Sequence, residues 1–108
     1  MQTRIQVLCR PGRSLREAIA DDSRLDRFGL EVVREHKAGR SPGWMKLKSV
    51  HRNHHGAINV EWDSPMQTLR CRVVTRGRGR PGEVTAEFLR YLLAVHHRRI
   101  ESVLIRPG

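Results

Sequence analysis

The chain has 108 residues, enough for one domain of ordinary size and too few for two. Its 21 lysines and arginines against 11 acidic residues give a formal net charge of +10, and its mean hydropathy is −0.56. No apolar run reaches the 18 residues that a transmembrane helix needs, and no apolar leader follows Met1. These features exclude a membrane-spanning class, and we expect a cytoplasmic protein with a single basic domain over residues 1–108.

The first half of the chain predicts a strand, a helix and further strands. Thr3–Cys9 alternates apolar and polar side chains, which is typical of a strand. Ser14 and Glu17 form a capping-box pattern for a helix that extends to about Arg27, and an interruption at residues 21–23 is left open. Three strands are expected to follow, of which the first is ambiguous with helix: Leu30–His36, Trp44–Val50 and Ala57–Asp63.

The next strand, Thr68–Arg76, predicts a hairpin with Ala57–Asp63 around a turn at residues 64–67. Placing Val60 opposite Cys71 makes one face of this hairpin apolar throughout, and Glu61 then lies opposite Arg70 on the other face. The same reasoning places Leu47 opposite Val60, so that the strand before the hairpin joins the same sheet.

The C-terminal part predicts the longest helix of the chain, Gly82–Ile100, with a broad apolar stripe at Val84, Leu89, Phe88, Leu92, Leu93 and Val95. Ser102–Ile105 is short and nearly all apolar, so we expect an interior strand. The element order is β-α-β-β-β-β-α-β. It predicts an α+β fold with two layers, a mainly antiparallel β-meander with the helices packed on the sheet.

The clearest functional signal is a concentration of arginines near the end of the predicted hairpin. Five arginines and no acid fall within residues 70–80, and the last of them lie in a glycine loop that leads into the long helix. Arginine suits phosphate groups, and backbone amides at a helix N-terminus attract anions. We therefore expect binding of nucleic acid or another polyanion through Arg70, Arg72, Arg76, Arg78, Gly79 and Arg80, with Lys46 and Lys48 extending the surface.

Other interpretations of the same segments stay open. Arg78-Gly79-Arg80-Pro81 resembles the core of an AT-hook, which implies an extended segment in an A·T minor groove. Gly77-x-Gly79-x-x-Gly82 has the form of a dinucleotide fingerprint, but the chain has no room for a second nucleotide-binding half. A composition rich in arginine throughout, with no functional meaning, is a further alternative.

An enzymatic function is not favoured. The region from Ser14 onward is similar in element order to the restriction-endonuclease-like core, which implies a metal-dependent nuclease using Glu61 and Asp63. The acid-x-lysine triplet of that family is absent, because the matching strand reads Leu69-Arg70-Cys71-Arg72. We expect no catalytic residue, metal or cofactor, although histidines within His51–His55 leave a metal site open. A homodimer or a small interaction module is also compatible with the sequence.

Overall fold

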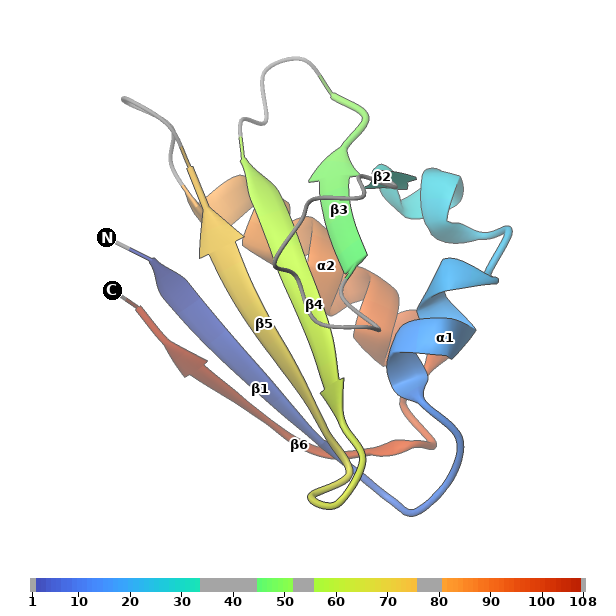
Figure 1. The fold of residues 1–108 in the computed structure, drawn as a ribbon. Helices are drawn as coiled ribbons and strands as arrows, with labels where there is room; N and C mark the ends of the chain where they lie inside the picture. Colours follow the sequence, from blue (N-terminus) through green and yellow to red (C-terminus); the bar gives the residue numbers. More distant parts are fainter. Residues whose placement is uncertain (1, 34–44, 52–55, 76–80, 108) are drawn as a thin grey trace.

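The computed structural model describes residues 2–33, 45–51, 56–75 and 81–107. Its elements follow the predicted order and confirm the α+β class (Figure 1). They are β1 (Thr3–Cys9), α1 (Leu15–Ala20), the 3-10 helix η1 (Leu25–Phe28), β2 (Leu30–Val33), β3 (Met45–Ser49), β4 (Ala57–Asp63), β5 (Thr68–Val74), α2 (Pro81–Val95) and β6 (Ile100–Arg106).

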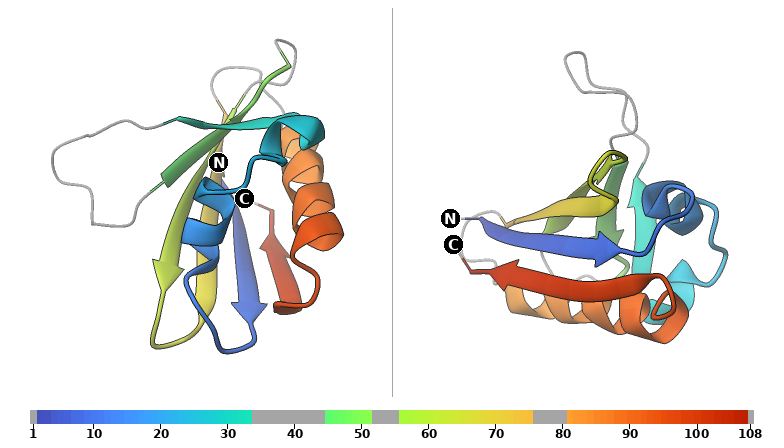
Figure 2. Two further views of the ribbon diagram at one scale, coloured as in Figure 1. Left: turned by 90° about the vertical axis from the view of Figure 1, so that its right-hand side faces the viewer. Right: turned by 90° about the horizontal axis from the view of Figure 1, so that it is seen from below.

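The strands form one antiparallel sheet in the order β2-β3-β4-β5-β1-β6. Strands β2 to β5 make the expected meander, and β1 then lies between β5 and β6. The two ends of the chain therefore lie beside each other, and α1 and α2 lie on one face of the sheet (Figures 1 and 2). No helix of the described residues lies on the opposite face, which is called the open face below.

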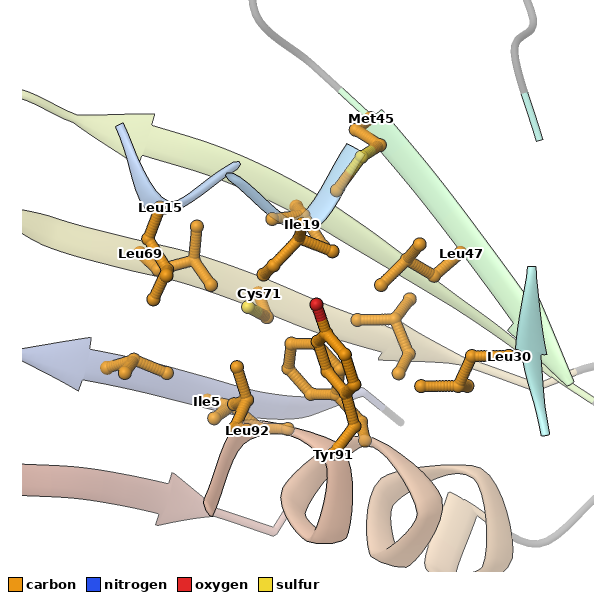
Figure 3. Close-up of a cluster of buried hydrophobic side chains, with 14 of the residues drawn as sticks. Ile5, Leu15, Ile19, Leu30, Met45, Leu47, Leu69, Cys71, Tyr91 and Leu92 are labelled. Atoms are coloured by element: carbon orange, nitrogen blue, oxygen red, sulfur yellow. The ribbon is translucent and has the colours of Figure 1, made fainter. Parts of the chain in front are cut away.

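The core lies between the sheet and the two helices. Alternate residues of β1, β4 and β5 point into it, together with Leu15 and Ile19 of α1. Figure 3 shows Tyr91 extending from α2 into this cluster, among side chains that come from both layers. Within the described residues, neither helix has the length and apolar character needed to cross a membrane.

Strand pairing confirms the predicted hairpin and corrects the strand before it. Val60 lies opposite Cys71 and Glu61 opposite Arg70, as the alternation predicts. In contrast, Leu47 lies opposite Ile58 and not opposite Val60, so the predicted β3–β4 register is wrong by two residues. A shift of two residues keeps every side chain on its face, so the apolar pattern cannot detect it. On its other side β3 pairs with β2, where Ser49 lies opposite Leu30.

The first predicted helix is interrupted where the sequence left that open. The Ser14 side chain caps α1 by accepting a hydrogen bond from the Glu17 amide at 3.2 Å, and α1 ends at Ala20. Asp22 accepts from the Arg24 amide at 2.9 Å, which turns the chain before η1. Gly29, at a φ of +80°, then ends η1 in the left-handed conformation.

The predicted end of the long helix was wrong by five residues, because α2 stops at Val95. The Arg99 amide donates to the His96 carbonyl at 2.9 Å, which closes a turn that reverses the chain. The Arg10 amide in turn donates to the Arg99 carbonyl at 2.8 Å. Because of this turn, β6 begins at the next residue. The helix ends early so that β6 can pair with β1, and helix propensity alone does not predict such a tertiary requirement.

The prediction of an interior C-terminal strand was also wrong. Among the described strands, β6 lies at the edge of the sheet and pairs with β1, and Leu104 and Ile105 keep 55% and 43% of their surface exposed. Leu93 of the predicted apolar stripe is 56% exposed beside it. An apolar run shows that a strand tends to be covered, but it does not show which element covers it.

Candidate nucleic-acid interface

The open face carries a row of basic side chains that crosses five strands. Arg106 of β6 lies opposite Arg4 of β1, Arg4 opposite Arg72 of β5, Arg72 opposite Asn59 of β4, and Asn59 opposite Lys46 of β3. Because directly opposed residues of a sheet point to the same face, these five side chains lie together. Strands are about 4.8 Å apart, so this basic row is about 19 Å long.

Three arginines of the basic row have charges that are not neutralised by an ion pair among the described residues. Arg4 and Arg106 are exposed and Arg72 is partly buried. Among the residues that the structure describes, no carboxylate lies within ion-pair distance of any of the three. The row itself contains no acid, so its positive potential is not cancelled by a neighbour within the row.

The other predicted basic residues of the open face lie beside acids. Arg70 forms an ion pair with Asp63, with 2.9 Å between Nη2 and Oδ2, and lies opposite Glu61. Lys48 forms an ion pair with Glu31 at 3.2 Å. The charges of Arg70 and Lys48 are therefore partly neutralised by these carboxylates.

A shallow hollow of about 290 Å³ lies on the open face over β1, β4 and β5. Its polar lining is Arg4, Gln6, Asn59, Glu61, Arg70 and Arg72. The hollow offers guanidinium and amide donors next to one another. The Glu61 carboxylate lies among these donors.

The predicted glycine-loop residues lie outside the described residues. This applies to Arg76, Arg78, Gly79 and Arg80, so their role stays a prediction. β5 ends at Val74, two residues beyond Arg72, and α2 begins at Pro81.

Two members of the basic row were missed by the sequence analysis. Arg4 was assigned to the polar face of the first strand without a function, and Arg106 lies beyond the predicted C-terminal strand. The alternation of Thr3–Cys9 indicated which way Arg4 points. Finding the row also required knowing that β1 lies between β5 and β6, and no local pattern encodes that placement.

The described residues give little support to a nuclease site with carboxylates and a metal ion. Glu61 and Asp63 do lie on the open face, but Asp63 is engaged by Arg70. Within the described parts of the chain, no three histidine, cysteine or acidic side chains are grouped to hold a metal ion. His51 lies on the helix side, 3.9 Å from Glu87, while His54 and His55 fall outside the described residues.

The cysteines and Trp62 do not contribute to the open face. Both thiols are buried, and burial raises the pKa of Cys9 and of Cys71, which keeps them neutral. Trp62 packs against the core on the helix side. Among the described residues, the open face therefore shows no aromatic side chain.

A second polar cluster lies away from the open face and joins the segment before η1 to α2. The Tyr91 hydroxyl donates to Asp22 Oδ2 at 2.7 Å and lies 2.8 Å from His96 Nε2. Burial opposes ionisation of Asp22, but hydrogen bonds from Arg24 and Tyr91 outweigh it and lower the pKa of this carboxyl to about 2. Burial raises the pKa of Tyr91 and lowers that of His96. With the Asp22 side chain 5% exposed, this cluster stabilises the fold.

A second buried acid is Glu87 of α2. Its side chain is 9% exposed, and Ser49 Oγ donates to it at 3.0 Å. It therefore joins α2 to β3 on the helix side of the sheet.

No protein-family model, curated protein or solved structure matches the chain.

Proposed function

We propose that this protein binds nucleic acid through its open face, by contacts to backbone phosphates with little base preference. The observation that carries the proposal is the basic row, four cations and one amide side by side with no acid among them. A cytoplasmic location belongs to the same proposal.

The length of the basic row suits a polyanion better than a small anion. One strand of a duplex presents a phosphate about every 3.4 Å of helix axis. A row of about 19 Å therefore faces several phosphates at once, whereas a single phosphate would engage only one or two of its cations.

A duplex is favoured over a single strand. Proteins that bind single strands combine a basic groove with aromatic side chains on which bases stack. The described part of the open face supplies donors and no aromatic ring, so its contacts are to phosphate and sugar. Such contacts position a duplex without reading its sequence.

The test is a salt titration of duplex binding, followed by fluorescence anisotropy of a labelled 20-base-pair DNA. Engaging the four cations of the row gives a slope of log K against log salt near −4, since each neutralised phosphate contributes about −0.9. Changing Arg4, Arg72 and Arg106 to Gln should reduce the magnitude of that slope by about 2 to 3 and weaken binding at every salt concentration.

A matched variant separates the basic row from net charge. Arg13, Arg27 and Arg90 are exposed and lie away from the open face, and changing them to Gln removes the same three charges. We expect this control to change the slope by less than about 1. Absence of binding at 50 mM salt, or an equal effect of the two triple variants, would overturn the proposal.

A further inference from the structure

Within the described part of the chain, the C-terminal strand forms one long edge of the sheet. β6 has seven residues and pairs with β1, and no other described strand pairs with the backbone groups along its outer side. The opposite edge strand, β2, has only four residues. Long edges with unpaired backbone groups are templates for adding another strand.

Apolar side chains flank this edge on both faces of the sheet. Leu104 lies on the open face with 55% of its surface exposed. Ile105 lies on the helix face, 43% exposed, next to Leu93 of α2, which is 56% exposed. A groove of about 390 Å³ runs between α2 and β6, and Leu89, Leu93, Val103 and Ile105 line it. An edge that presents apolar surface on both sides favours a covering partner.

We propose that β6 pairs antiparallel with β6 of a second copy of this chain, forming a symmetric dimer with a continuous sheet. In such a pair the twofold axis is perpendicular to the sheet, and opposed side chains share a face. The axis must therefore pass midway between the two copies of one residue, which then lie directly opposite each other. This condition leaves only a few registers to compare.

The register centred on Leu104 is self-complementary. Leu104 then lies opposite Leu104 of the second copy, Val103 lies opposite Ile105, and Ser102 lies opposite Arg106. The apolar residues of the helix face meet one another beside Leu93 of both copies. No like charges are placed directly opposite in this register.

The neighbouring registers are worse for identifiable reasons. Centring on Val103 places the charge of Glu101 opposite the apolar Ile105 on the groove side. Centring on Ile105 places the charge of Arg106 opposite the apolar Leu104 on the open face. The sequence of the edge therefore selects a second copy in one register.

Net charge gives this association a distinctive salt dependence. Two copies that each carry +10 repel one another, and salt screens that repulsion while leaving apolar contacts intact. The dimer should therefore become tighter as salt rises, in contrast to nucleic-acid binding. An extended acidic segment of another protein would bind the same edge more weakly as salt rises.

The association is tested by sedimentation velocity from 1 to 300 μM protein in 100 and 500 mM sodium chloride. We expect a monomer–dimer equilibrium that is tighter at 500 mM. Leu104→Arg should weaken it at least tenfold, because it places two like charges opposite each other at the axis. Met66→Arg adds the same charge at an exposed position in the β4–β5 turn and should leave the equilibrium unchanged.

Cysteine cross-linking tests the register. Directly opposed residues have Cα atoms about 4.5–5.5 Å apart, within the range that a disulfide spans. Leu104→Cys should therefore form a covalent dimer on mild oxidation. Ser102→Cys should not, because the two copies of residue 102 lie about 14 Å apart along the pair. The native Cys9 and Cys71 are buried and do not interfere.

Three results would overturn the proposal: a monomer at 300 μM in 500 mM salt, a Leu104→Arg dimer as tight as wild type, or cross-linking through Ser102→Cys instead of Leu104→Cys. None of these results tests duplex binding, which is measured separately by the salt titration with variants of the basic row.

Discussion

Replacing Asp22 with asparagine should destabilise the protein by about 2 kcal/mol at neutral pH and by much less in acid. The pKa of this carboxyl falls from its ordinary value of 3.8 to about 2 in the folded protein. Burial opposes ionisation, but the Arg24 guanidinium at 2.8 Å, the Arg24 amide and the Tyr91 hydroxyl stabilise the carboxylate more strongly. One pKa unit corresponds to about 1.4 kcal/mol, which gives the stated cost.

The sign of the pH dependence follows from the lowered pKa. The stabilisation is fully present above the unfolded pKa of 3.8 and is lost as pH falls through the folded pKa of about 2. The difference between wild type and Asp22→Asn should therefore be about 2 kcal/mol at pH 7, roughly half of that at pH 3, and under about 0.5 kcal/mol at pH 2.

Urea unfolding followed by circular dichroism at these pH values measures the difference, and thermal unfolding should show a Tm lower by about 8 °C at pH 7. Asp21→Asn is the matched control, since Asp21 is 72% exposed and its ion pair with Arg13 spans 3.3 Å. Exposed pairs contribute little, so this variant should change stability by less than about 0.5 kcal/mol. A pH-independent cost for Asp22→Asn, or equal costs for the two variants, would refute the reasoning.

Four further predictions follow from the core, the turns and the open face. Phe88→Ala should cost about 3–5 kcal/mol in urea unfolding, because the side chain is fully buried, and a cost below about 1 kcal/mol would contradict the packing described. Gly29→Ala should cost at least about 1 kcal/mol in the same assay, since its φ is +80°, and a neutral result would be inconsistent with that conformation. Glu61→Gln should tighten duplex binding by removing an acid beside the basic row, while magnesium-dependent nicking of plasmid that depends on Glu61 would instead support a nuclease. Arg78→Ala with Arg80→Ala should lower the salt slope by about 2 and leave stability within about 0.5 kcal/mol, and unfolding of this variant would make those arginines structural.

Local alternation was enough to predict the central hairpin. Val60 and Cys71 are apolar residues of strands joined by a short turn, and any odd shift between these strands would have exposed one set of side chains. The β3–β4 register needed more than alternation, because a shift of two residues is silent in the pattern.

The open face was only half predictable, for a related reason. Arg72 and Lys46 were identified because they lie on strands that are consecutive in the chain. Arg4 and Arg106 join them only through pairings between the two ends of the chain. Such contacts depend on the whole topology, so a sequence without relatives for comparison gives no signal for them.

The position of β1 also has a consequence for how the protein folds. β1 is the first strand in the chain, yet both of its neighbours, β5 and β6, come from the second half. During synthesis it has no partner until Thr68, which pairs with Leu8 and lies 60 residues after it, has been added. Contacts this distant in sequence slow folding, because a long loop must close before they form. Refolding is therefore expected over milliseconds to seconds, with the β2–β5 meander able to form before the N-terminal strand inserts.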